Sequence, residues 1–291
     1  MKPTWSKFEQ LDIPKFTPAD FCETLDGGQS FRWYETEASS SLEPEYIGAF
    51  GNVASILKLS KTGKVLCSVH KRGTEKLVEE YLDGKRDYCA LRKSLKKIGD
   101  NIMNRALEVY PTLRILRQPS DEAIICFICS SSKRIVQIKQ CVKLLSENFG
   151  EEIVDGIFTL PSFQKLAKLS VDDIKKCKLG FRASYLKNTA EKICADNFNP
   201  EQLRVMPYKD GKKYLTSLSG IGEKVADCIL LFGAGKMDAF PVDTWIKKAM
   251  SELYQTPENP DKIREFASKK FGSHAGFAQQ LIFATKRKNL L

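Results

Sequence analysis

The sequence predicts an α+β protein, in which a lobe built on an antiparallel β-sheet precedes a mainly α-helical lobe. Between residues 30 and 70, short segments rich in aromatic and β-branched residues alternate with turn formers such as Lys61-Thr62-Gly63, which is typical of antiparallel strands. After Tyr110-Pro111 this pattern ends, and amphipathic helical patterns follow one another. We therefore place an N-terminal α+β domain over residues 1–112 and a helical domain over residues 113–291.

The segments follow in a simple order along the chain. The predicted strands are SFRWYETE, EYIGAFGN, VASILKLS and KVLCSVHK, and helical spacing of apolar residues marks 75–82 and the continuous stretch 89–107 of the same lobe. The second lobe is predicted to be helical throughout, with helices in DEAIICFICS, RIVQIKQCVKLLSENF, SFQKLAKL, VDDIKKC, RASYLKNTAEKICAD and DKIREFASKKF. No repeat or low-complexity linker separates the lobes, so we expect them to pack around a shared cleft.

The composition favours a polyanionic partner. The 291 residues include 46 Lys and Arg against 36 Asp and Glu, which gives a net charge of +10. Such a charge favours DNA, RNA or an acidic membrane surface without choosing among them. No stretch is apolar over eighteen residues or more and no signal peptide is visible, so we expect a soluble intracellular protein.

The cysteines indicate free thiols in a reducing compartment. The chain has nine of them, scattered along its length. Cys126 and Cys129 form a Cys-x-x-Cys in an apolar run with no second pair, so buried packing is favoured over zinc. No four-cysteine spacing suggests an iron–sulfur cluster.

A glycine hairpin is the most informative local feature. In Leu218-Ser219-Gly220-Ile221-Gly222 two glycines allow a sharp turn, and the run GEKVADCILLF that follows has helical spacing. Free amides at the start of such a helix bind phosphate without reading base sequence. The alternative is a turn that joins two helices and binds nothing.

Lys224 and Asp243 flank the helix that follows the hairpin. The lysine could contact phosphate, lie on the surface or act as a nucleophile, and its residue type alone favours the first two. Asp243 precedes a helical pattern, which predicts a helix N-cap and leaves an active role open. Cys228 lies four residues after Lys224, as Phe283 does after Gln279, so each pair projects from one helix face.

Six motifs, taken together, resemble the 8-oxoguanine DNA glycosylases of the helix-hairpin-helix superfamily. They are GQSFRW, FICSSSKRI, LGFRASY, LSGIGEKVADC, FPVD and GFAQQLIF, and they follow the family's order from residue 28 to residue 283. The resemblance implies an enzyme that flips a damaged guanine out of duplex DNA, cleaves its glycosidic bond and nicks the strand by β-elimination.

The resemblance also implies roles for single residues. Lys224 matches the nucleophile that attacks the sugar C1′ and holds the substrate as a Schiff base, and Asp243 matches the aspartate that stabilises positive charge developing on the sugar. Gly28 matches the glycine whose carbonyl accepts the N7 hydrogen of 8-oxoguanine. Gln279 matches the side chain that reads the Watson–Crick edge, and Cys228 with Phe283 matches the pair around the flipped ring.

The chain departs from the family where the opposite strand would bind. The family's asparagine run is replaced by Ser131-Ser132-Lys133-Arg134, and one of its cytosine-reading arginines by Gln137; Arg182 matches the second arginine. The wedge tyrosine is Phe181, and a histidine that follows the catalytic aspartate is Trp245. We expect a relaxed preference for cytosine opposite the lesion, because each lost contact to a base weakens discrimination by roughly 1 to 3 kcal/mol. The alternative is that Arg134 substitutes for the missing arginine.

The resemblance further implies a monomer that acts on double-stranded DNA and binds no membrane, in the cytoplasm of a bacterium or the nucleus of a eukaryote. No cofactor is expected to be required, although the carbonyls of Thr216, Leu218 and Ile221 could hold a hard cation at the hairpin. Gly220 and Gly222 would grip the DNA backbone. Two alternatives remain, a glycosylase of the same superfamily with another base specificity and a non-catalytic DNA-binding module.

Overall fold

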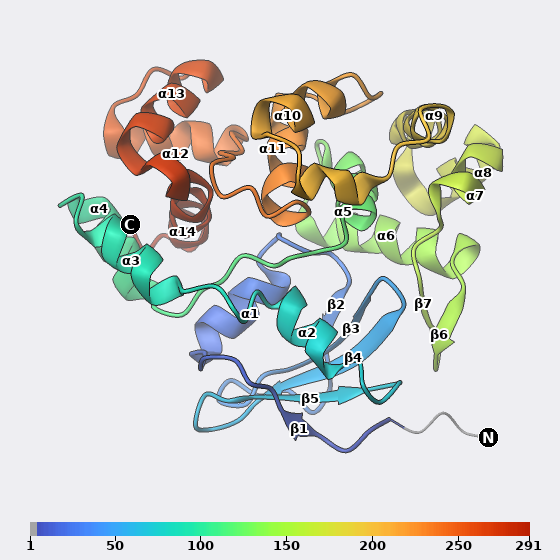
Figure 1. The fold of residues 1–291 in the computed structure, drawn as a ribbon, viewed down its shortest axis with the longest axis horizontal. Helices are drawn as coiled ribbons and strands as arrows, with labels where there is room; N and C mark the ends of the chain where they lie inside the picture. Colours follow the sequence, from blue (N-terminus) through green and yellow to red (C-terminus); the bar gives the residue numbers. More distant parts are fainter. Residues whose placement is uncertain (1–4) are drawn as a thin grey trace.

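The computed structural model describes residues 5–291, and its first lobe is a five-stranded antiparallel sheet (Figure 1). Residues 1–4, with which the predicted first domain begins, lie outside the described residues. The strand order is β1-β5-β4-β3-β2. The strands are β1 (Glu9–Gln10), β2 (Trp33–Glu35), β3 (Glu45–Phe50), β4 (Val53–Leu59) and β5 (Val65–Val69). The four predicted strands are confirmed, whereas β1, only two residues long, carries no periodic signal.

Two helices cover the face of the sheet that looks toward the second lobe. Helices α1 (Pro18–Asp26) and α2 (Glu75–Tyr81) lie between the sheet and the helical lobe (Figure 1). Phe21 of α1, Tyr81 of α2 and Trp33 of β2 are fully or almost fully buried in one core. The burial of such aromatic side chains is a main stabilising contribution to this lobe.

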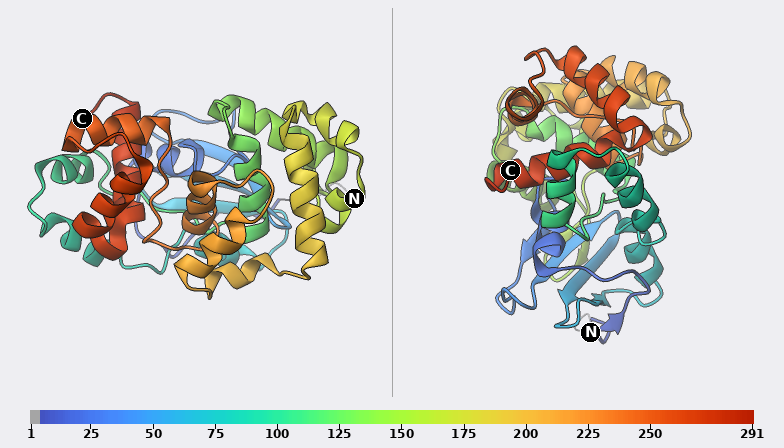
Figure 2. Two further views of the ribbon diagram at one scale, coloured as in Figure 1. Left: turned by 90° about the horizontal axis from the view of Figure 1, so that it is seen from above. Right: turned by 90° about the vertical axis from the view of Figure 1, so that its left-hand side faces the viewer.

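The continuous helical pattern over 89–107 forms two helices rather than one. They are α3 (Tyr88–Lys96) and α4 (Asn101–Val109). Gly99 adopts φ 71° between them, and the Asp100 side chain caps α4 by accepting from the Met103 amide at 2.6 Å. Both helices bury their apolar faces in the core of the helical lobe, where α4 packs against α14 (Figure 2). The domain boundary at residue 112 stays a prediction. Helices α3 and α4 precede this boundary in the sequence but pack in the core of the helical lobe.

The helical lobe is built around α5 (Ser120–Ser130), whose residues are almost all buried. It is followed by α6 (Ile135–Phe149), α7 (Phe163–Lys168), α8 (Val171–Ile174), a π-helical turn (Lys175–Leu179), α9 (Arg182–Ala195), a 3-10 turn (Pro200–Arg204), α10 (Tyr208–Thr216), α11 (Glu223–Phe232), α12 (Thr244–Tyr254), α13 (Pro260–Phe271), a 3-10 turn (Gly272–His274) and α14 (Ala275–Arg287). Each predicted helix is present.

The prediction of a wholly helical second lobe is wrong at one place. Strands β6 (Glu152–Val154) and β7 (Ile157–Phe158) form a hairpin that extends down beside the main sheet (Figure 1). Asp155 and Gly156 both have positive φ, 45° and 76°. An Asp-Gly pair accommodates this turn with little strain. These two residues are therefore the part of the sequence that indicates the hairpin.

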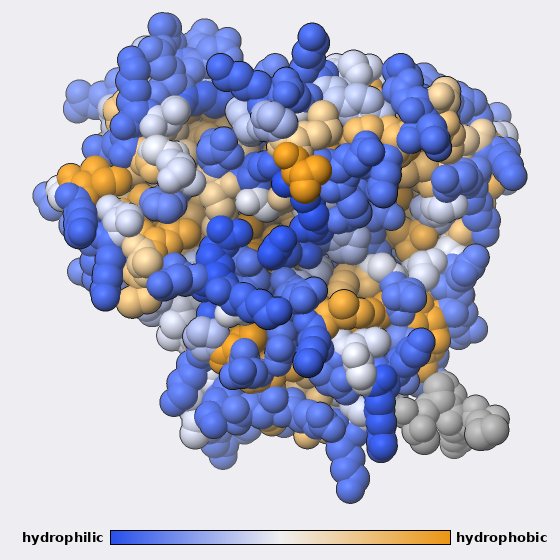
Figure 3. Space-filling view, in the orientation of Figure 1, coloured by the Kyte–Doolittle hydropathy of each residue, from blue (hydrophilic) through white to orange (hydrophobic). Residues whose placement is uncertain are grey.

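Side chains of both lobes meet in a buried ion pair. Arg32, next to β2, pairs with Glu122 of α5, and Glu122 also accepts from the Gly51 amide at 2.9 Å. The face of the molecule in Figure 3 is mainly hydrophilic, with hydrophobic residues in small separate groups. Within residues 5–291, no helix combines the length and the apolarity that crossing a bilayer requires.

Candidate active site

A cavity of about 1050 Å³ lies where the lobes meet. Its walls come from segments far apart in the chain: the turn after α1, the 130–138 segment at the start of α6, helix α11, the loop before α12, and helix α14. Its lining includes the six residues to which the resemblance assigns chemistry or base recognition, namely Gly28, Lys224, Cys228, Asp243, Gln279 and Phe283. The fold thus brings together what the sequence separates.

The glycine hairpin joins α10 to α11 at one edge of this site. Gly220 has φ 77°, and a Cβ there would lie 2.6 Å from the side chain of Tyr185. Only glycine fits this position, because both the backbone conformation and the contact exclude a side chain. The Ser219 carbonyl accepts from the Thr189 hydroxyl at 2.8 Å. Helix α9 therefore holds the hairpin, and α11 begins directly after Gly222.

Lys224 lies in the first turn of α11 and is half-buried. Its ammonium lies 5.9 Å from the centroid of the Phe127 ring, and it forms no ion pair with a carboxylate among residues 5–291. Lys212, by contrast, pairs with Glu223 at 2.6 Å and with buried Asp227 at 3.1 Å. Among the described residues, Lys224 thus lacks the carboxylate partners that hold Lys212.

Cys228 lies one turn further along α11 and is buried. Burial raises the pKa of its thiol to about 11, while the charge of Lys224 opposes the rise. The thiol is therefore neutral near pH 7, and it presents a polarizable surface to the cavity rather than an anion.

Asp243 is the N-cap of α12, as predicted. Its carboxylate accepts from the Ile246 amide at 2.7 Å. It is half-buried and lines the same cavity as Lys224. The cap fixes the carboxylate, so a negative charge is held at a defined place in the wall.

Gly28 and α14 form another part of the cavity wall. Gly28 has φ 102°, and a Cβ there would lie 3.1 Å from Ile135 and 4.0 Å from Phe283. The side-chain oxygen Oε1 of Gln279 and the side-chain nitrogen Nε2 of Gln280 are buried without a hydrogen-bond partner among the described residues. Such groups are costly to bury unpaired. Both glutamines line the cavity, so a ligand there could supply the missing bonds.

Comparison with known proteins agrees with this geometry. The model of the HhH-GPD superfamily base excision DNA repair proteins matches residues 125–273, and that of the 8-oxoguanine DNA glycosylase N-terminal domain matches residues 12–124. The 8-oxoguanine glycosylase/lyase of Clostridium acetobutylicum in its apo form is 33% identical, with TM-score 0.83, over 96% of this chain and 99% of that chain.

Two further matches cover nearly the whole chain. The Clostridium enzyme in complex with duplex DNA containing cytosine opposite to 8-oxoguanine is 32% identical, with TM-score 0.84, over 99% of each chain. The N-glycosylase/DNA lyase of Saccharomyces cerevisiae is 27% identical in an alignment of 334 positions that covers 96% of this chain and 86% of that protein. The chain belongs to the 8-oxoguanine DNA glycosylase/lyase family of the HhH-GPD superfamily. It is an N-glycosylase/DNA lyase, and the non-catalytic alternative is set aside.

In this glycosylase/lyase the residues expected at the opposite strand are divided between two places. Ser132, Arg134, Gln137 and Trp245 line the cavity, and the indole of Trp245 is exposed. The Gln137 side chain accepts from the Arg134 amide at 3.0 Å and thereby caps α6. These side chains lie at the cavity mouth, where a second strand could reach them.

Arg182 and Phe181 lie outside the lining of this cavity. Arg182 is only 6% exposed, and its guanidinium donates to the Ser131 and Leu179 carbonyls at 2.6 Å and 3.1 Å. Phe181 is 56% exposed and packs edge-on against Tyr185. Arg182 therefore directs its guanidinium at two backbone carbonyls of the protein, whereas the ring of Phe181 is largely exposed.

Sequence reasoning missed several lining residues of the glycosylase/lyase cavity. Gln280 and Arg287 of α14 are polar, and Phe31 and Phe127 supply aromatic walls. Arg287 lies four residues after Phe283, so its helical spacing could have placed it on the same face. Gln280 carries no comparable signal, because it follows Gln279 directly.

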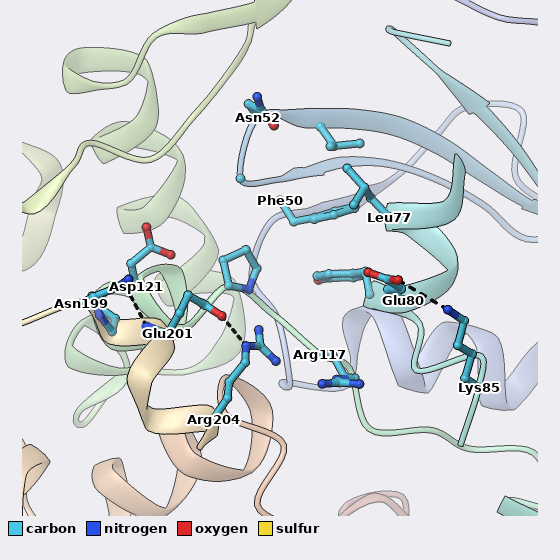
Figure 4. Close-up of a pocket in the computed structure, with 15 residues that line it drawn as sticks. Phe50, Asn52, Leu77, Glu80, Lys85, Arg117, Asp121, Asn199, Glu201 and Arg204 are labelled. Carbon is cyan, nitrogen blue, oxygen red and sulfur yellow. Dashed lines mark hydrogen bonds and ion pairs between the residues drawn. The ribbon is translucent and has the colours of Figure 1, made fainter. Parts of the chain in front are cut away.

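A second cavity, of about 760 Å³, lies between α2 and the start of α5 (Figure 4). Its charged side chains largely pair with one another: Lys85 with Glu80 at 3.6 Å, and Arg204 with Glu201. None of the residues to which the resemblance assigns a role lines it. The first cavity is therefore the candidate active site.

Proposed function

We propose that this enzyme excises 8-oxoguanine from duplex DNA and then nicks the strand at the resulting sugar. The observation that carries the proposal is the meeting of Lys224, Asp243 and the base-binding residues in one cavity between the lobes. The relatives named for 8-oxoguanine support this base over the others on which the superfamily acts.

The base must leave the helix stack before it can react, because the sugar carbon is shielded in duplex DNA. A cavity of about 1050 Å³ leaves ample room for a flipped nucleoside. Gly28 would accept the N7 hydrogen that 8-oxoguanine has and guanine lacks. Gln279 would read the Watson–Crick edge, and Cys228 and Phe283 would hold the ring between them.

In the first chemical step the neutral amine of Lys224 attacks C1′. The C1′–N9 bond breaks, its electron pair leaves with the base, and the sugar becomes attached to the lysine nitrogen, which gives up one proton to the departing base. The Asp243 carboxylate stabilises the positive charge that develops on the sugar. Opening of the sugar ring gives a Schiff base. Loss of a C2′ proton then expels the 3′ phosphate, which nicks the strand by β-elimination.

The hairpin would bind the DNA backbone next to this site. Amides at Gly220, Gly222 and the start of α11 suit a phosphate oxygen. A hard cation held by the carbonyls of Thr216, Leu218 and Ile221 would fit the same chemistry, because a donor set made only of carbonyl oxygens favours such ions.

We further propose a relaxed preference for cytosine opposite the lesion. Gln137 replaces an arginine of the family, and Arg182 is committed to two backbone carbonyls. The base opposite the lesion would then meet fewer hydrogen-bond donors that are specific for cytosine. Arg134 and the exposed ring of Phe181 would accept several bases at this position.

Trapping with borohydride tests the chemistry. Incubation with an 8-oxoguanine duplex and borohydride should give a covalent protein–DNA adduct, because reduction fixes a Schiff base. Lys224→Gln should form none, whereas Lys61→Gln, which removes a lysine from the sheet lobe, should trap like the parent. An adduct with Lys224→Gln, or none with the parent, would refute the mechanism.

Excision rates opposite the four bases test the pairing preference. The rates should differ by about 100-fold or less at one fixed salt concentration, because each missing base contact contributes roughly 1 to 3 kcal/mol. A preference for cytosine of several thousandfold would contradict relaxed reading.

A further inference from the structure

Two acidic residues of α1 pair with two helices that line the active-site cavity. Glu23 bonds Arg287 of α14 at 2.8 Å, and Asp26 bonds Lys139 of α6 at 2.8 Å. Helix α1 ends directly before the Gly27-Gly28 turn, and the Gly27 amide donates to the Glu23 carbonyl at 3.0 Å. The element that carries Gly28 is therefore tied to α14 and α6, whose side chains Phe283 and Ile135 lie next to Gly28.

The bond between Glu23 and Arg287 is largely removed from water. The Glu23 side chain is 1% exposed and that of Arg287 26%. Lys288 adds a second cation 3.5 Å from the Glu23 carboxylate. Burial raises the pKa of Glu23, and the charges of Arg287 and Lys288 oppose the rise. A pair in such a setting is harder for solvent and salt to screen than a surface pair.

Arg287 also contacts the aromatic wall of the base site. Its guanidinium carbon lies 5.6 Å from the centroid of the Phe283 ring, within the range of a cation–π interaction. Arg287 lines the cavity, and its Nε has no hydrogen-bond partner among the described residues. One side chain thus holds the ring of Phe283 and, through Glu23, the turn at Gly28.

We propose that Arg287 is a positioning residue for the flipped base, which sets the separation and orientation of Phe283 and Gly28 through its contacts with the Phe283 ring and Glu23. The inference rests on the proposed excision of a damaged base. The flipped base would meet Gly28 at its N7 edge and Phe283 at its face, so a ring that tilts or a turn that shifts would weaken its binding. An abasic site has no base, and Lys224 and Asp243 can react with its sugar without these walls.

The test compares two reactions of one active site. Arg287→Met should lower kcat/KM for excision of 8-oxoguanine by about 10-fold, which is the size expected for loss of one cation–π contact and its ion pair. Cleavage at a preformed abasic site should change by less than about threefold. Arg287→Lys, which keeps the charge, should recover part of the excision, and Glu23→Gln should show the same split as Arg287→Met.

Lys286→Met is the matched control. Lys286 precedes Arg287 on α14 and pairs with Glu252 of α12 at 2.6 Å, away from the base site. Its loss removes the same charge and one ion pair, so both reactions should stay near parent rates. Equal losses of excision and abasic cleavage in Arg287→Met, or the same split in Lys286→Met, would overturn the inference. Failure of the parent to excise 8-oxoguanine would instead refute the proposed function.

Discussion

Asp243 combines two properties that a single substitution can separate. Its carboxylate caps α12 through the Ile246 amide, and it places a negative charge in the wall of the cavity that Lys224 also lines. Asparagine is as good an N-cap as aspartate, but it carries no charge. The structural contribution can therefore be kept while the electrostatic one is removed.

Asp243→Asn should lower the single-turnover excision rate by about 100-fold or more, the usual effect of removing a preorganised charge-stabilising group. The melting temperature should change little. Asp87→Asn is the control, because Asp87 caps α3 in the same way through the Ala90 amide at 2.8 Å, remote from the cavity. The outcome that would contradict this is a large fall in the melting temperature of Asp243→Asn but not of Asp87→Asn, with excision reduced only as far as the folded fraction is. The helix cap, and not the charge, would then explain the effect of Asp243.

For single residues, the sequence predicts which side chains share a helix face better than which partners they contact. The spacing of Lys224 and Cys228 placed both on one helix face, and the cavity lining agrees with this. The contacts of Arg182 could not be predicted, because they join it to the Ser131 carbonyl, far away in the sequence. Pattern reasoning finds neighbours on one element and not partners on another.

Among the elements, the hairpin between α10 and α11 depends on a close contact with α9. Gly220→Ala should displace the hairpin, since its Cβ would lie 2.6 Å from Tyr185 at φ 77°. We expect the affinity for any duplex, damaged or intact, to fall by about 10-fold, while the rate at saturating enzyme changes less. Fluorescence anisotropy with both duplexes measures the first effect and single-turnover excision the second.

Gly99→Ala separates backbone strain from the contact. Gly99 has φ 71°, but a Cβ there would meet nothing within 4 Å. As the control, Gly99→Ala should lower the free energy of unfolding and leave the affinity for DNA unchanged. If Gly220→Ala binds DNA as tightly as the parent, the hairpin is not the backbone grip.

The same elements show where sequence patterns lose information. Long amphipathic helices and six- or seven-residue strands were predicted because several periods of their pattern can be read. The break between α3 and α4 depends on Gly99 and Asp100, and the β6–β7 hairpin on Asp155 and Gly156. One or two residues decide each of these features, and a periodic average over the segment conceals them.

In the whole molecule, the buried pair between Arg32 and Glu122 links the lobes that form the active-site cavity. Burial raises the pKa of Glu122 to about 7, and the charge of Arg32 opposes that rise. The ordinary value is 4.5, so the folded protein binds this proton more tightly than the unfolded chain does. The contribution of Glu122 to stability is therefore full below about pH 4.5 and declines as pH rises through 7.

Arg32→Met should steepen this decline, because the charge that favours the ionised carboxylate is lost. At pH 5.5 Glu122 keeps its proton in the folded state, so the variant should cost only about 1 kcal/mol, mainly for lost hydrogen bonds. At pH 8.5 the unpaired Glu122 must either carry a buried negative charge or stay protonated at a pH where the unfolded chain is ionised. The loss of unfolding free energy should then reach about 3 kcal/mol. Urea unfolding at the two pH values measures the difference. Arg32→Met combined with Glu122→Gln removes the titrating group, so the cost relative to the parent should no longer grow with pH; growth of the same size would assign the effect to other groups.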